Sequence, residues 1–411
     1  LQLGSGNFTL AAWIKPANIA GGTNYGYFAG GTITIPGGYN QTSIIQRIDY
    51  ADDTATALAK GPLSAIRTFG GSSSSTSYGY SFGGYPGSIT TVDRLDYSSD
   101  TTTASPRGPL NTAVARNSGI GNNDYGYSIG GNTPEVTTVE RIDYSNDTAT
   151  AAVKGPLSFA KRTSGSTGNQ SYGYFGGGWK DSKRSLVDRI DYSSDTSTAA
   201  SKGPLSAARY AMGAAGNASY GWWAGGGHPS VTTTDRLDYS SDTTTAVAKG
   251  PLTSVRRFHG ATGSASYGYW AGGVPVGTRI TNVDRIDYSN DTPTASAKGP
   301  LGTAVADIQS SGYSSKQNGA PLLNDNEGII SYSDTAGEEN DTTCQFHLNN
   351  DGKIRFTGAA GIVTSTSAVA ADTWSHAAVT RTDNTISVYV NGVLENTGIT
   401  THTFSDYAKV T

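Results

Sequence analysis

The sequence is poor in the residues that most catalytic and metal sites use. It contains 1 Cys, 1 Met and 5 His in 411 residues. The single cysteine, Cys344, cannot form an internal disulfide. No Cys/His spacing suits a metal, and no histidine stands beside an evident nucleophile. We therefore expect no catalytic residues, no metal site and no cofactor. The protein is accordingly not expected to be an enzyme.

Charge and long apolar runs are also scarce. Charged residues make up 15% of the chain and the net charge is −4, without a basic run. Binding of nucleic acid through phosphate neutralisation is therefore not expected. No apolar stretch approaches about 18 residues, so we expect no membrane insertion. The chain begins with Leu1, in the middle of a pattern, which predicts a fragment or a processed piece.

Glycine, by contrast, is abundant at 54 residues, and much of it belongs to a repeat. Each copy contains a Tyr-Gly-(Tyr/Trp) element, an Arg-(Ile/Leu)-Asp-Tyr element and a Gly-Pro-Leu element. Successive copies of the last two elements lie 47 to 49 residues apart. The elements start at Tyr25, Tyr78, Tyr125, Tyr172, Tyr220 and Tyr267, at Arg47, Arg94, Arg141, Arg189, Arg236 and Arg285, and at Gly61, Gly108, Gly155, Gly203, Gly250 and Gly299.

A period near fifty residues is typical of propellers and solenoids. The repeated segments are short and rich in aromatic and β-branched residues, and clusters of Gly, Asn, Asp and Pro bound them. A unit of this length holds about four strands of roughly five residues. The sequence therefore predicts an all-β fold with a six-bladed β-propeller.

The ends of the array predict how the ring closes. Each later Tyr-Gly element follows a strand-like run with an arginine, such as residues 65–69, and the first copy lacks this run. An unused run at 303–308 follows the sixth Gly-Pro-Leu and matches residues 112–116, with Asp307 in place of Arg116. We expect this late segment to complete the first blade.

The repeated arginines admit two interpretations. Together with the repeated aspartates they could form a ring that binds cations or sugars. Alternatively, each could be a structural residue that pairs with a repeat Asp and fixes the register between blades. Six copies in six blades favour the structural role for Arg47, Arg94, Arg141, Arg189, Arg236 and Arg285.

The repeat unit resembles the kelch repeat over roughly residues 21–316. A hydrophobic strand runs into Gly-Gly, a Val-(Asp/Glu)-Arg-hydrophobic-Asp strand follows, and a polar turn leads through a Pro-containing link to an arginine. The tryptophan usual a few residues after the second tyrosine is Thr or Ala here. The resemblance implies a kelch-like architecture. Copper-oxidase chemistry of some kelch-like proteins is not expected, because Cys344 lies outside the repeats.

The two ends of the chain resemble parts of a laminin-G-like, or concanavalin-like, sandwich. The strand Phe-Thr-Leu-Ala-Ala-Trp-Ile at 8–14 is similar to the family's opening strand, and the runs at 374–381 and 387–394 are similar to two later strands. We expect residues 1–20 and 317–411 to form one incomplete β-sandwich, in which the propeller is inserted. The alternative places residues 1–16 in a separate upstream sandwich that the propeller follows.

Positions that differ between copies are free to serve recognition. The loops after Gly-Gly differ most, and we expect them on one face of the propeller. The candidate ligand-binding residues in these loops are Tyr39, Tyr85, Trp179, Lys180, Asp181 and His228.

The two resemblances together are similar to the make-up of phage tail fibres and bacterial surface proteins. They imply a non-enzymatic adhesin or fibre protein, extracellular or on a virion surface, that binds a glycan or a host surface protein. One alternative is a self-assembling appendage or capsid-decoration protein, whose partners are its own copies or other virion proteins. The other is a glycan-cleaving enzyme with carboxylates at the propeller mouth. Fold alone does not decide among these functions.

Overall fold

The computed structural model describes residues 8–14, 25–132, 134–312, 328–332, 344–348, 353–358, 361–368 and 375–399. The chain divides into two compact units. Leu1–Gly21 and Pro321–Thr411 form the sandwich unit, and Gly22–Ala320 forms the propeller unit. The remaining parts of the predicted domains, Trp374 among them, lie outside the described residues.

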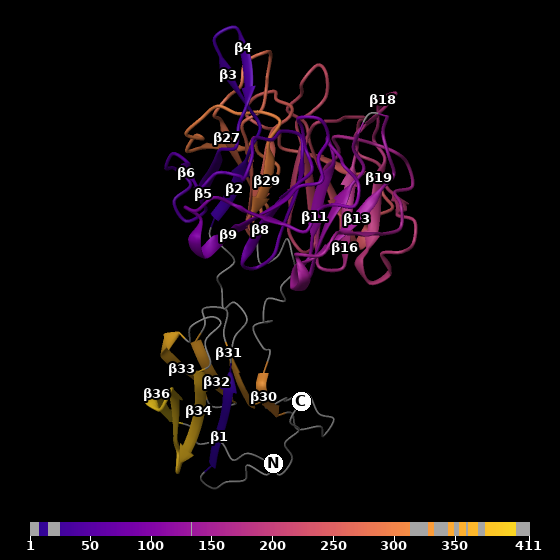
Figure 1. Ribbon diagram of the computed structural model, residues 1–411. Coiled ribbons are helices and arrows are strands. Elements are labelled where there is room, and N and C mark those ends of the chain that lie inside the picture. The colour runs from indigo at the N-terminus through magenta and orange to yellow at the C-terminus, as the bar shows by residue number, and fades with distance from the viewer. Residues whose placement is uncertain are drawn as a thin grey trace. The chain divides into compact units, whose positions relative to one another are not determined.

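The propeller unit contains six four-stranded antiparallel sheets, the blades (Figure 1). We number the blades by their second strand and give their strands from the inside outwards. Blade 1 consists of β29 (Gln309–Gly312), β2 (Tyr25–Ala29), β5 (Ile45–Asp49) and β6 (Leu58–Lys60). Blade 2 consists of β7 (Gly71–Ser74), β8 (Tyr78–Phe82), β9 (Val92–Asp96) and β10 (Ser105–Arg107). Blade 3 consists of β11 (Ser118–Gly121), β12 (Tyr125–Ile129), β13 (Val139–Asp143) and β14 (Ala152–Val153). Blade 4 consists of β15 (Gly165–Gly168), β16 (Tyr172–Gly176), β19 (Val187–Asp191) and β20 (Ala200–Lys202). Blade 5 consists of β21 (Gly213–Gly216), β22 (Tyr220–Ala224), β23 (Thr234–Asp238) and β24 (Val247–Lys249). Blade 6 consists of β25 (Gly260–Gly263), β26 (Tyr267–Ala271), β27 (Val283–Asp287) and β28 (Ser296–Lys298).

The ring is closed by a strand from the far end of the array. Strand β29 pairs with β2 of blade 1 and contacts the inner strands of both neighbouring blades, β7 and β25. The predicted all-β fold with a six-bladed propeller is confirmed, and so is closure by the late segment. The predicted boundary was wrong, because β29 begins one residue after the run at 303–308.

The arginine-bearing runs are links between blades and do not form strands. In the run at 65–69, Phe69 has φ 58°, and in the run at 303–308 Asp307 has the same value. This left-handed conformation is incompatible with an extended strand. The inner strands therefore begin only after these residues, at Gly71 and Gln309.

Hydrophobic cores lie between the blades. Six clusters of buried side chains are each shared by two neighbouring blades. The leucine of every Gly-Pro-Leu element is buried, as Leu252 is in the cluster between blades 5 and 6. The Gly-Gly doublets have positive φ throughout, as at Gly83 and Gly84, a conformation that glycine adopts without steric cost.

An aspartate in the polar turn of each repeat joins two blades. The repeat arginine of one blade reaches the aspartate of the next at 2.6 to 3.0 Å. The pairs are Arg47–Asp100, Arg94–Asp147, Arg141–Asp195, Arg189–Asp242, Arg236–Asp291 and Arg285–Asp53. The last pair joins blade 6 to blade 1, so these contacts run around the whole ring.

Each of these aspartates is a hub with three side-chain partners. Asp53, for example, also binds Lys298 at 3.1 Å and accepts a hydrogen bond of 2.9 Å from the hydroxyl of Tyr269. Burial alone would raise the pKa of Asp53, but hydrogen bonds from Lys298 and Tyr269 and the charge of Arg285 hold this pKa below its ordinary value. The repeat arginines thus join neighbouring blades around the ring, each through a carboxyl group of the next blade.

A second, fully buried ion pair lies within four of the blades. The link to the blade provides the cation and the third strand provides the carboxylate. The pairs are Arg67–Asp93, Lys161–Asp188, Arg209–Asp235 and Arg256–Asp284. Blade 1 has Val305 and Gln46 at these two positions, and blade 3 has Val114 and Glu140. The Gln46 side chain instead hydrogen-bonds the backbone of Thr303 through both its oxygen and its nitrogen.

The sandwich unit contains two four-stranded antiparallel sheets that contact each other. One consists of β1 (Phe8–Ile14), β34 (Ser375–Thr382), β35 (Thr385–Val390) and β36 (Val393–Ile399), and the other of β30 (Gly328–Tyr332), β31 (Cys344–Leu348), β32 (Lys353–Gly358) and β33 (Gly361–Ala368). Because β1 pairs with β34 over seven residues, residues 8–14 belong to the same sheet as the C-terminal strands.

Candidate binding face of the propeller

One face of the propeller carries both the loops after Gly-Gly and the links between blades. In a four-stranded antiparallel blade, the connection between strands 2 and 3 and the link into strand 1 emerge at the same end. Isolated bridges join the two kinds of segment, as between Arg162 and Trp179 and between Arg257 and Val274. We call this the loop face. It includes the hairpins β3–β4 (Thr32–Ile35, Gly38–Gln41) and β17–β18 (Trp179–Lys180, Ser182–Lys183) (Figure 1).

At the centre of the loop face, six link residues form a closed ring. They are Phe69, Arg116, Thr163, Ala211, Phe258 and Asp307, one from each link, and all have φ between 50° and 59°. The backbone N–H of each donates to the carbonyl oxygen of the preceding one, at N···O distances of 2.6 to 3.0 Å. Asp307 accepts from Phe69, which completes the circle. We call this the mouth ring.

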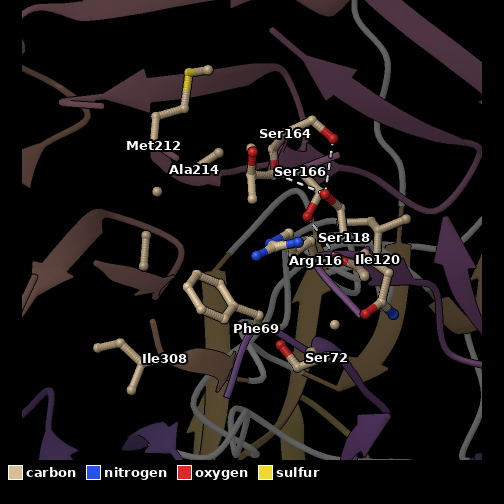
Figure 2. Close-up of a pocket in the computed structure, with 18 of the residues that line it drawn as sticks. Phe69, Ser72, Arg116, Ser118, Ile120, Ser164, Ser166, Met212, Ala214 and Ile308 are labelled. Carbon is tan, nitrogen blue, oxygen red and sulfur yellow. Dashed lines mark hydrogen bonds between the residues drawn. The ribbon is translucent and has the colours of Figure 1, made fainter. Parts of the chain in front are cut away.

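Below the mouth ring lies a central cavity of about 150 Å³ (Figure 2). Small residues of the inner strands line it. One wall carries the hydroxyls of Ser118, Ser164 and Ser166, and the other carries Ala214 and Met212. The hydroxyls already have partners: Ser118 and Ser164 lie 2.8 Å apart, and Ser166 donates to the Gly119 carbonyl at 2.6 Å. The cavity thus has one polar and one apolar wall, and the mouth-ring residues also line it.

Aromatic side chains form a continuous track across the mouth. The rings of Trp179 and Tyr210 are 5.1 Å apart, those of Tyr210 and Phe258 are 6.2 Å apart, and those of Phe258 and Phe69 are 5.5 Å apart. All three contacts are edge-to-face. The guanidinium of Arg116 lies 5.6 Å from the centre of the Phe69 ring. We call these four aromatic residues the aromatic track; all of them are half-buried.

Asp307 is the only acidic residue of the mouth ring, and its carboxyl is buried. It accepts a hydrogen bond of 2.7 Å from the hydroxyl of Thr32, which in turn contacts the guanidinium of Arg279 at 3.0 Å. Burial raises the pKa of Asp307 to about 6, although Thr32 and the charges of Arg279, Arg257 and Arg116 act to lower it. The mouth thus contains a carboxyl whose pKa is raised by burial to about 6.

Asp307→Asn is expected to stabilise the protein at pH 8 and to change little at pH 4. Because the pKa is raised in the folded state, the stability that the protonated carboxyl contributes is present below its ordinary pKa of 3.8 and is lost as the pH rises through about 6. An amide copies the neutral carboxyl at every pH, so the gain at pH 8 should reach about 2 to 3 kcal/mol. Urea titrations at pH 4, 6 and 8 measure it.

Asp287→Asn serves as the control for this pH dependence. A hydrogen bond from Ser289 lowers the pKa of Asp287, so its contribution is present above its ordinary pKa and lost in acid. Its replacement should therefore lower stability at pH 8. Stability curves of Asp307→Asn and the unchanged protein that run parallel from pH 4 to pH 8 would contradict the assignment for Asp307.

The structure places the six candidate ligand residues on the loop face but in different surroundings. Trp179, Lys180 and Asp181 belong to the β17–β18 hairpin, with Asp181 exposed at its turn. Tyr85 is 45% exposed and is bound to Thr68 through its backbone.

Tyr39 and His228 each stand beside an arginine. Tyr39 is 62% exposed, and the guanidinium of Arg279 lies 4.3 Å from the centre of its ring. The exposed imidazole of His228 accepts a hydrogen bond of 2.8 Å from Arg257 through Nδ1. The aromatic track thus includes Trp179, and it does not include Tyr39 or Tyr85.

Sequence reasoning missed most of the aromatic track and the mouth arginines. Tyr210, Phe258, Phe69, Arg116 and Arg257 lie in the links, where the sequence predicts strands of the scaffold. The signal was present, because these positions also differ from copy to copy: Arg116 and Asp307 occupy equivalent places. The same internal comparison that singled out the loops would have found them.

Two kinds of feature are absent from the described part of the chain. Among those residues there is no group of three or more His, Cys, Asp or Glu side chains that could hold a metal ion. The same residues include no helix long and apolar enough to cross a membrane.

The comparisons with known proteins agree with the two units. Residues 321–410 match the family model described as the concanavalin A-like lectin/glucanases superfamily. The sandwich unit contains a concanavalin-like domain. The search of curated proteins found no match. Among solved structures, the one described as "Structure of YjhT" is similar with a TM-score of 0.54 and 11% identity, and the match covers 66% of this chain and 97% of that chain. At this identity the likeness shows the propeller fold alone.

Proposed function

We propose that this protein is a non-enzymatic glycan-binding protein of a cell or virion surface, an adhesin or fibre component that binds through the loop face of its propeller. The observation on which the proposal rests is the aromatic track at the mouth. Its four rings come from one loop and three different links, and they lie next to hydrogen-bonding side chains such as Arg116 and Arg257. Rigid aromatic surface beside polar groups suits the apolar faces and hydroxyls of sugar rings.

The arrangement also supports binding rather than catalysis. In the central cavity Ser118 and Ser164 are hydrogen-bonded to each other, and Ser166 donates to the Gly119 carbonyl. The repeat aspartates are engaged as hubs between blades. Asp307, the acid of the mouth ring, is bound to Thr32. A glycosidase needs two carboxyl groups on either side of a sugar bond. The mouth ring offers one.

The concanavalin-like domain supports the proposed extracellular or virion-surface location. It accompanies the propeller in one chain, as expected of a protein that binds surfaces through more than one module. The kelch-like nature of the repeats and the extracellular or virion location remain parts of this proposal.

Glycan binding by the full chain tests the proposal. On an array of neutral and charged glycans, we expect binding that Trp179→Ala and Tyr210→Ala each weaken about two- to tenfold, because each removes a ring worth roughly 0.5 to 1.5 kcal/mol of stacking. Leu58→Ala and Val153→Ala are matched controls, since both side chains are more than half exposed on outer strands. These two changes should leave the affinity unaltered.

Other outcomes would contradict the proposal in distinguishable ways. Multimers of the chain that bind no glycan would favour a self-assembling building block. Release of products from a labelled polysaccharide would favour a glycan-cleaving enzyme. Binding that survives both changes in the aromatic track but is lost in Tyr85→Ala would place the site elsewhere on the loop face.

A further inference from the structure

Most cations of the propeller, Arg116 apart, fall into two groups. The arginines and lysines of the strands and the buried links are neutralised by carboxylates within 4 Å. Five described cations of the propeller form no such ion pair, and all five belong to the loop face. They are Lys180, Lys183, Arg184, Arg257 and Arg279. Unpaired positive charge in the described propeller is thus confined to one face.

Neutral partners fix the positions of the three arginines in this group. Arg257 donates to His228 at 2.8 Å and stacks against Phe258, with 5.3 Å between the guanidinium carbon and the ring centre. Arg279 donates to the hydroxyl of Thr32 through two nitrogens, at 3.1 and 3.0 Å.

Arg184 donates to the carbonyl of Lys180 at 3.0 Å and lies 4.8 Å over the ring of Phe159. A guanidinium has five N–H donors, so each of these arginines keeps donors for a further acceptor. The neutral contacts hold the guanidinium groups in place without cancelling their charge.

The loop face carries more cations than carboxyl groups. The face carries seven cations outside the buried pairs, the five named above with Arg116 and Arg162. Its three carboxyl groups are Glu135, which pairs with Arg162, Asp181 at the tip of the hairpin, and Asp307. This excess occurs in a chain whose net charge is −4.

We propose that the ligand of the loop face is an acidic glycan, whose carboxylate or sulfate groups bind Arg257 and Arg279 while its sugar rings stack on the aromatic track. The inference rests on the proposed function and names the class of its ligand. Arginine suits such anions because its planar fork binds two oxygens at once. Arg257 is adjacent to the track, since it stacks on Phe258, a member of the track. Arg279 lies beside the mouth ring, because it donates to Thr32, which in turn donates to Asp307.

Binding of the full chain to matched polymers tests the inference. The probes are polygalacturonate and the same polymer after reduction of its carboxyl groups, and dextran sulfate and dextran. We expect at least tenfold tighter binding to the charged member of a pair. The two pairs distinguish a carboxylate from a sulfate ligand. Raising the salt from about 0.01 M to about 1 M shortens the Debye length from about 30 Å to about 3 Å and should weaken this binding strongly.

Variants assign the effect to the loop face. Arg257→Gln and Arg279→Gln should each weaken binding to the acidic polymer about tenfold. Thr245→Glu, in an exposed turn on the opposite face, changes the net charge of the chain by the same amount and should have no effect. Asp307→Asn, measured at pH 8, removes a mouth carboxylate and should tighten binding, a gain that misfolding cannot produce.

Three outcomes overturn the inference, and they bear differently on the proposed function. Equal binding to charged and neutral polymers, lost in Trp179→Ala, would reject the acidic ligand and keep the glycan-binding function. Binding to neither polymer of either pair, with none on the glycan array, would reject both. Binding to an acidic peptide in place of all glycans would also reject both.

Discussion

Asp284→Gln is expected to lower the free energy of unfolding by about 3 to 5 kcal/mol, the cost of leaving one partner of a buried ion pair without its counter-charge. Asp284 and Arg256 are both fully buried, and their side chains meet at 2.7 Å. The carboxylate also accepts hydrogen bonds from the backbone and the hydroxyl of Thr253. With an amide in its place, the Arg256 guanidinium would remain charged and buried.

The protein itself supplies the control for this prediction. Blade 1 has Val305 and Gln46 where blade 6 has Arg256 and Asp284. The double change Arg256→Val with Asp284→Gln copies that neutral arrangement, so it should return the stability to within about 1 kcal/mol of the unchanged protein. Urea unfolding followed by tryptophan fluorescence measures both variants. A double variant as unstable as the single one would show that the packing of blade 6, and not the buried charge, sets the cost.

Gly250→Ala is expected to destabilise the propeller by about 3 kcal/mol or more, at or beyond the upper end of the usual range for overpacking. A Cβ added at Gly250 would lie 1.7 Å from the carbonyl oxygen of Pro293 in the next blade. The obstacle is backbone, which cannot move aside as a side chain can. The N–H of Gly250 also donates to the carbonyl of Asp291 at 2.8 Å, so the two segments are held together at this point.

Gly38→Ala is the matched control, because it lies in the exposed β3–β4 hairpin with no atom within 4 Å of an added Cβ. Its effect should stay within about 0.5 kcal/mol. The same contrast should appear at the other Gly-Pro-Leu elements, where the added Cβ would lie 1.8 to 2.0 Å from a carbonyl oxygen of the next blade. Thermal unfolding of the variants tests it. Equal midpoints for Gly250→Ala and Gly38→Ala would contradict the contact.

The sequence predicted the fold where the strand chemistry is visible. Strands β8 and β9 coincide with the Tyr-Gly-Tyr and Arg-Leu-Asp elements, whose aromatic and branched side chains fill the cores between blades. The inner strands escaped prediction. Gly71–Ser74 consists of Gly and Ser, which have low strand propensity. Such residues extend there because six strands converge on the axis, where larger side chains do not fit. That condition belongs to the ring as a whole and is not encoded in any single repeat.

The candidate site was predicted only in part, for a similar reason. Trp179 and His228 lie in loops of unequal length, which a comparison of repeats identifies readily. Phe69, Arg116 and Phe258 lie in links of almost constant length. Their φ is positive although none of them is a glycine, so the sequence does not indicate this conformation. Only the assembled ring shows that these links meet at one point and that their variable side chains surround a common entrance.

In the mouth ring, main-chain atoms close the ring, and side chains are left to contact a ligand. Its hydrogen bonds use main-chain atoms alone, and the side chains at its six places are two Phe, one Arg, one Thr, one Ala and one Asp. A protein engineer could therefore exchange these side chains, alone or in combination, and give the entrance new chemistry while the closure stays the same. The propeller would then offer six exchangeable side-chain positions around one entrance, each on a backbone that the mouth ring already holds in place.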